Sequence, residues 1–194
     1  MTTNQKNPIM NTQELINEIK QVHNTLLKEV DAANHKAETK KEELLKAFTK
    51  DNARFKVGDV IMENHPAYGP VSFTLIRVDA ISAFMEELTP VIRYHGRELY
   101  PDFAETYDIY GSPRFQTLYD RGNASDITRL EKPLYASYTV VSAEGKEFPT
   151  NSYRETFDIA RRELTGTKTK YVVRYGITPS GERKEIQKIY NIKK

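Results

Sequence analysis

The feature that most constrains this chain is a stretch near its N-terminus in which apolar residues recur at helical spacing. From residue 15 to residue 48 the sequence contains neither Gly nor Pro, the two residues that most disfavour a helix interior. Apolar positions follow one another at intervals of three and four residues, which is the period of one helix face. They are Leu15, Ile19, Val22, Leu26, Val30, Ala33, Ala37, Leu44 and Phe48. The pattern predicts an amphipathic helix over residues 11–50, preceded by a flexible arm over residues 1–10.

This apolar stripe repeats every eleven residues, a period of about 3.67 residues per turn that lies close to the natural helix period. The stripe should therefore run nearly straight along the helix. Asn11 and Glu14 fit a capping box and place the helix start at residue 11 or 12. Residues 31–41 carry only small alanines in the stripe, so a close crossing of helices and a break into two helices both stay open.

A helix of this length, about 58 Å at ~1.5 Å per residue, cannot bury the stripe by itself. We expect it to be covered by a second copy in a coiled coil, by its own second half folded back, by the downstream domain or by another protein. The predicted protein-interaction residues are Leu15, Ile19, Val22, Leu26, Val30, Leu44 and Phe48.

Residues 53–133 are typical of short β-strands separated by turns. The alternating segment 55–61 predicts a first strand, in which Gly58-Asp59 can form a turn or bulge. A two-residue His95-Gly96 linker between two apolar runs predicts a hairpin turn, because Gly tolerates positive φ. Further strands are expected over residues 71–81 and 126–130. Between them, residues 102–122 suggest a short strand and a one-turn helix.

The segment Phe55-Lys56-Val57-Gly58-Asp59-Val60-Ile61 resembles the first strand of many SH3-like small β-barrels. The five short strands that end at Leu130 are similar to that plan, and the resemblance spans residues 53–131. It implies an adaptor module that binds peptides, nucleic acid or other proteins.

Residues 134–194 predict a separate small β-α-β-β domain. A strand over residues 138–141 is followed by a Glu144-Gly145 turn, and Ser152 with Glu155 forms the capping box of a helix that ends near residue 164. A hairpin over residues 170–177 and 184–192 then turns at residues 178–181. The helix should bury a stripe at 4-3-4 spacing, made of Tyr153, Phe157, Ala160 and Leu164. One face of the first hairpin strand should pack on this helix, leaving the other face wetter and basic. The whole chain is therefore assigned to the α+β class.

Charge is spread unevenly, although the net charge is only +2. Residues 134–194 carry 12 basic against 7 acidic residues, whereas residues 51–133 carry 9 basic against 13 acidic residues. Basic groups interleaved with tyrosines on a sheet are what single-stranded nucleic acid requires, although an ordinary solvated sheet face is the alternative. Within the basic region 161–194, the candidate nucleic-acid-binding residues are Lys168, Lys170, Arg174, Arg183, Lys184 and Lys188.

No catalytic motif is present. The sequence has no cysteine, which excludes disulfides, thiolate metal ligands and thiol nucleophiles. Phosphate-binding glycine motifs, the nucleophile elbow and the zinc-protease motif are also missing. His23 and His35 lie too far apart on the helix to share a metal ion, and His65 beside Glu63 could form an acid–base couple, with an exposed loop residue as the simpler interpretation. We predict no enzyme, no metal site and no cofactor, with an enzyme that leaves no local motif as an open alternative.

Two functional hypotheses follow. In the first, the chain is a non-catalytic binding or assembly protein that self-associates or engages a protein partner through the helix, with the β modules as interaction surface. In the second, it is a nucleic-acid-binding accessory protein that uses the C-terminal hairpin. We expect a cytoplasmic location, since the sequence shows no signal peptide, no membrane span and no cysteine. The composition is similar to that of many small bacterial and bacteriophage proteins, so a virion-associated role belongs to the first hypothesis.

Overall fold

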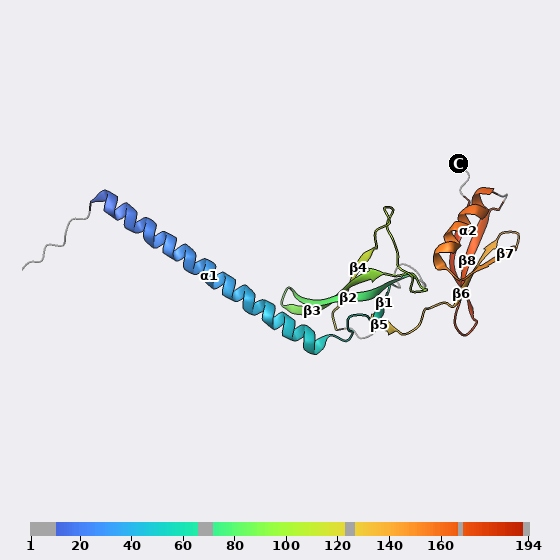
Figure 1. The fold of residues 1–194 in the computed structure, drawn as a ribbon, viewed down its shortest axis with the longest axis horizontal. Coiled ribbons are helices and arrows are strands. Elements are labelled where there is room, and N and C mark those ends of the chain that lie inside the picture. The colour runs from blue at the N-terminus through green and yellow to red at the C-terminus, as the bar shows by residue number, and fades with distance from the viewer. Residues whose placement is uncertain (1–10, 66–71, 123–126, 167–168, 192–194) are drawn as a thin grey trace, which may run out of the picture. The chain divides into compact units, whose positions relative to one another are not determined.

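A computed structural model describes residues 11–65, 72–122, 127–166 and 169–191. The predicted α+β class is confirmed: helix α1 (Thr12–Asn52) precedes a five-stranded antiparallel sheet, and a four-stranded sheet with helix α2 (Tyr153–Gly166) follows (Figure 1). The chain divides into two compact units, Met1–Phe48 and Thr49–Lys194. The predicted arm over residues 1–10 lies outside the described residues.

Helix α1 is continuous through residues 31–41, where the sequence left a break open (Figure 1). Its predicted capping box is confirmed in both directions. The Glu14 backbone N–H donates to Asn11 Oδ1 at 2.9 Å, and the Asn11 N–H donates to Glu14 Oε2 at 3.1 Å. The box satisfies backbone donors that a helix start otherwise leaves without partners. Among the residues described, no helix is both long enough and apolar enough to cross a membrane.

The first sheet contains β1 (Val60–Asn64), β2 (Phe73–Glu86), β3 (Thr89–Glu98), β4 (Phe115–Asp120) and β5 (Ile127–Leu130). Its strand order is β4-β3-β2-β1-β5, so β1 to β4 form a meander and β5 returns to pair with β1. In the described part of the chain β4 and β5 stay at opposite edges, and no closed barrel forms. The fully buried side chains of the sheet include Ile61, Leu75, Ile76, Val78, Tyr94 and Leu118.

The predicted hairpin turn at His95-Gly96 is wrong. Both residues lie inside β3, and the turn between β2 and β3 is formed by Glu87 and Leu88, with Glu87 at a φ of 55°. Gly96 is needed for close approach instead, because a Cβ there would lie 1.9 Å from the carbonyl oxygen of Arg77. The crowding arises at a β-bulge, where the register between β2 and β3 shifts around Asp79.

Other strand predictions differ in detail. The first strand begins at Val60 and not at Phe55, because the chain first makes the predicted turn, with Gly58 at a φ of 93°. Residues 102–122 contain no helix. Their only regular element is β4, which pairs with β3 from Ile92 to Arg97.

The second sheet contains β6 (Ser137–Ser142), β7 (Glu147–Thr150), β8 (Tyr171–Ile177) and β9 (Arg183–Tyr190), in the order β7-β6-β8-β9. Strand β7 was not predicted, so the unit is β-β-α-β-β. The turns at Gly145 and Gly181 are confirmed by their positive φ angles. The helix cap is confirmed in one direction, because the Glu155 N–H donates to Ser152 Oγ while the Glu155 carboxylate bonds to the Thr150 hydroxyl.

The buried face of α2 is rotated from the predicted one. Ala160 is buried as expected, but its buried companions are Thr156, Ile159 and Glu163, while Phe157 is 40% exposed. The helix packs into a core that also contains Val140 of β6 and Val172 of β8. The 4-3-4 spacing of apolar residues identifies the helix but not its inner face, because two of the buried residues, Thr156 and Glu163, are polar.

Candidate functional site

The α1 stripe, made of Leu15, Ile19, Val22, Leu26, Val30 and Leu44, is the largest set of exposed apolar side chains on one element. These side chains are 47–68% exposed, and α1 buries no residue at all. At about 100° of rotation per residue they all fall within an arc of about 80°. Phe48, the seventh predicted interaction residue, is half-buried. The structure therefore places the predicted residues on one straight face that is accessible in the single chain.

Outside the stripe and the exposed Ile16 and Leu27 beside it, α1 carries mostly polar residues. Exposed ion pairs join Lys40 to Glu43 at 3.2 Å and Lys41 to Glu38 at 3.3 Å. Such pairs each contribute only a few tenths of a kcal/mol. Residues 1–50 carry 8 basic and 7 acidic side chains, so the helix is close to neutral.

The predicted role of Arg174 in nucleic-acid binding is not supported, because its side chain is only 1% exposed. Its Nε donates to Thr156 Oγ1 at 2.8 Å and its Nη1 donates to Gln187 Oε1 at 2.7 Å. The guanidinium carbon lies 3.6 Å from the ring centroid of Phe157. Burial lowers the pKa of Arg174. Aromatic and hydrogen-bonding neighbours thus hold this cation inside the α2–β8 packing, where it stabilises the fold.

The opposite face of the hairpin carries the predicted combination of tyrosines and basic groups. Register pairs Tyr171 with Tyr190 and Val173 with Lys188, so these side chains share the face of the sheet away from α2. Lys188 Nζ lies 4.1 Å from the ring centroid of Tyr171 and 5.6 Å from that of Tyr190. We call Tyr171, Tyr190 and Lys188 the tyrosine face.

Other predicted cations are partly neutralised. Arg183 lies over the Tyr175 ring at 4.1 Å and bonds to Glu147 Oε1 at 2.9 Å. Lys184 pairs with Glu182 at 3.3 Å. Lys170 is exposed directly before β8, and Lys168 lies outside the described residues. The structure therefore gathers fewer unpaired charges on this hairpin than the sequence suggested.

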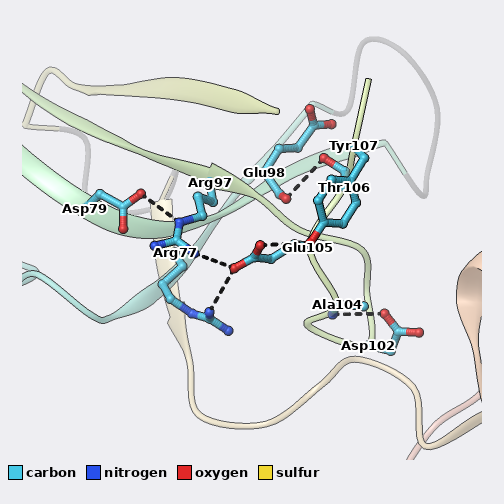
Figure 2. A network of polar contacts seen from close by, with 9 residues as sticks. All are labelled: Arg77, Asp79, Arg97, Glu98, Asp102, Ala104, Glu105, Thr106 and Tyr107. Carbon is cyan, nitrogen blue, oxygen red and sulfur yellow. Dashed lines mark hydrogen bonds and ion pairs between the residues drawn. The ribbon is translucent and has the colours of Figure 1, made fainter. Parts of the chain in front are cut away.

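A polar network crosses the first sheet and the loop that follows β3. Figure 2 shows Arg97 between Asp79 and Glu105: its Nη1 donates to Glu105 Oε1 at 2.7 Å, and its Nε lies 3.4 Å from Asp79 Oδ2. Arg77 Nη1 approaches the same Glu105 oxygen at 3.7 Å. Glu105 raises the pKa of Arg97, first through the hydrogen bond and then through its charge, with Asp79 adding to the effect.

The network balances two cations against two carboxylates. Each carboxylate faces a guanidinium, so the charges of the network are paired. The Thr106 backbone N–H and hydroxyl both bond to the Glu98 carbonyl oxygen, which ties the same loop to β3. We interpret these ion pairs and hydrogen bonds as structural contacts that hold residues 99–107 against the sheet.

Asp102 is a structural residue that the sequence did not reveal. Its Oδ1 accepts a bond from the Ala104 N–H, as local turn chemistry predicts (Figure 2). Its Oδ2 accepts a 2.7 Å bond from the N–H of Tyr153, the first residue of α2. A carboxylate at a helix N-terminus is favourable because it meets backbone N–H groups and the positive end of the helix dipole. The partner is 51 positions away, so only the fold could identify it.

The histidines form no metal centre among the residues described, where no group of three or more metal-ligating side chains occurs. His65 Nε2 lies 2.8 Å from Thr74 Oγ1 and 3.9 Å from Glu63 Oε2, so the predicted neighbour is present but the Thr74 hydroxyl is closer than the Glu63 carboxylate. His95 bonds to Thr117 and stacks on Phe115 across the β3–β4 pair.

Comparisons with protein-family models, with curated proteins and with solved structures find no match to this chain. Function must therefore be inferred from its own residues.

Proposed function

We propose that this chain is a non-catalytic assembly protein that self-associates through α1. The observation that carries the proposal is the α1 stripe, in which six large apolar side chains are about half exposed or more on a helix with no buried residue. Scattered exposed apolar residues are normal, but a continuous row is typical of an interface.

A second copy of α1 suits the stripe better than an unrelated surface for two reasons. A nearly straight stripe is matched along its whole length by another stripe of the same period. The near neutrality of residues 1–50 means that two copies do not repel each other strongly. A different protein with a complementary helix is the other possible occupant.

Sedimentation velocity of the full chain over a wide concentration range tests this proposal. Self-association predicts a concentration-dependent shift from monomer to a defined oligomer, with the helical circular-dichroism signal preserved. A monomer at every concentration would reject it.

The five-stranded sheet is proposed as the interaction module of the assembly, in the manner of SH3-like adaptors. The return of β5 to β1 and the four-strand meander support this interpretation. Exposed Leu88 at the β2–β3 turn and exposed Ile109 and Tyr110 in the loop before β4 offer apolar contact points.

Nucleic-acid binding is a second candidate, and the tyrosine face is the observation that favours it. Stacking rings beside an ammonium group provide the two contacts that single-stranded nucleic acid uses. Binding of a labelled single-stranded oligonucleotide should weaken steeply with salt, and Lys188→Ala should reduce it. Lys184→Ala is the matched control on the same strand, because Lys184 is already ion-paired. Binding that ignores salt, or equal effects of the two variants, would reject this candidate.

A further inference from the structure

An apolar groove lies between α2 and β9, beyond the strands on which the helix packs. Helix α2 contacts β6, β7 and β8, so the inner surface of β9 is left less covered. The groove encloses about 480 Å³, and its lining includes Ala160, Leu164 and Ile189 together with Phe157 and Tyr190, of which Tyr190 turns its ring to the tyrosine face. Asn191 also lines the groove, and its Nδ2 donates to the Leu164 carbonyl oxygen at 2.8 Å.

The strand beside this groove is an open edge. Strand β9 has a neighbour only on its β8 side in the described part of the chain, and it offers eight residues without proline. The opposite edge strand, β7, has four residues and contains Pro149, two features that block strand pairing. Of the two edges of this sheet, β9 is therefore the one able to accept another strand.

The charge of β9 and of the groove lining indicates what kind of strand could pair with β9. Arg161 is the only charged residue among the described residues that line the groove. Strand β9 itself carries three basic residues against one acidic residue, and of these Arg183 is paired with Glu147 and Lys184 with Glu182. Pairing β9 with β9 of a second copy would bring these basic residues close to each other, which is unfavourable. An acidic segment would instead be attracted.

We propose that β9 and the α2–β9 groove bind an extended, acidic peptide segment of a partner protein, which adds to the sheet as a fifth strand. Main-chain hydrogen bonds to β9 supply affinity, and alternate side chains of the added strand point to the α2 side, where an apolar one enters the groove. A carboxylate of the segment faces Arg161. The inference does not depend on self-association of α1.

The test uses the full chain and a fluorescein-labelled peptide of the same length as β9, measured by fluorescence anisotropy. One alternate set of its positions contains isoleucine and a glutamate, so that both face α2 when the strand adds, and the other set is threonine. We expect saturable binding, and a peptide with lysine in place of glutamate should bind at least about tenfold more weakly. Methylation of one alternate set of peptide amides should abolish binding while methylation of the other set is tolerated, because an added strand uses only one of its edges.

Two charge reversals on neighbouring α2 positions complete the test. Arg161→Glu should weaken binding about tenfold, whereas Arg162→Glu, outside the lining, should change it by less than about twofold. The proposal is overturned if the acidic peptide does not bind, if acidic and basic peptides bind alike, if both methylated sets bind equally, or if the two variants behave identically. Sedimentation of the same samples shows separately whether the chain self-associates through α1.

Discussion

Leu26, near the middle of the continuous N-terminal part of the α1 stripe, provides the sharpest test of self-association. Its side chain is 55% exposed in the single chain. Full burial of a leucine side chain stabilises by about 1.5–3 kcal/mol, so covering the exposed part is worth about 0.8–1.6 kcal/mol. In a symmetric dimer the substitution occurs twice. Leu26→Ala should therefore weaken dimerisation by about 1.6–3.3 kcal/mol, or about 15- to 250-fold in Kd.

Alanine is the appropriate replacement because it has the highest helix propensity, so α1 itself should remain helical. Asn24→Ala is the matched control, since Asn24 is exposed and lies about 160° around the helix from Leu26. Sedimentation equilibrium would give the Kd of each form, and circular dichroism would check the helix. Equal Kd values for the two variants would refute the reasoning, because the stripe would then have no part in association.

Three further predictions concern the β-rich unit. Arg174→Ala should lower the free energy of unfolding by about 3 kcal/mol, because it removes a buried side chain and the hydrogen bonds that Thr156 and Gln187 accept from it. Lys170→Ala should change the free energy of unfolding by less than about 0.5 kcal/mol. Urea unfolding measures both, and equal values would contradict the buried position of Arg174. Gly96→Ala should cost more than about 2 kcal/mol or prevent folding, because its Cβ would collide with the Arg77 carbonyl; an unchanged melting temperature would show that β3 does not approach β2 so closely. Burial raises the pKa of Tyr138 above its ordinary value of 10.0. The buried neutral tyrosine therefore makes its full contribution to the free energy of unfolding below about pH 10, and this contribution is lost as the pH rises further. The Tyr138 hydroxyl has no hydrogen-bond partner in the described structure, so Tyr138→Phe should hardly change the free energy of unfolding at pH 7. Above about pH 10 the variant should lose less of that free energy than the unchanged protein, by about 1.4 kcal/mol per pH unit. If the free energies of unfolding of the two proteins changed in parallel with pH, this effect would be excluded.

The elements that the sequence predicted correctly are those that depend on neighbouring residues. The Asn11–Glu14 box, the uninterrupted α1 pattern and the turns at Gly58, Gly145 and Gly181 depend only on residues within a few positions of each other. Each is set by backbone sterics or by a hydrogen bond inside one turn, and the structure has each of them at the expected place.

Elements that depend on distant partners were predicted less well. His95-Gly96 has the composition of a hairpin turn, yet the long β2 strand pairs straight past it and uses the glycine to bring two backbones together at a bulge. Strand β7 is short and contains a proline, so its sequence carries little strand signal without β6 beside it.

The sequence by itself determined where α1 begins, that its apolar residues share one straight face, and that the chain alternates between helical and β-rich segments. Only the tertiary structure decided which face of β8 turns inward, and it placed Arg174 against Phe157 and the tyrosines outside. The physical reason is that spacing fixes which side chains share a face, whereas the choice of the inner face depends on contacts with elements far away in the chain.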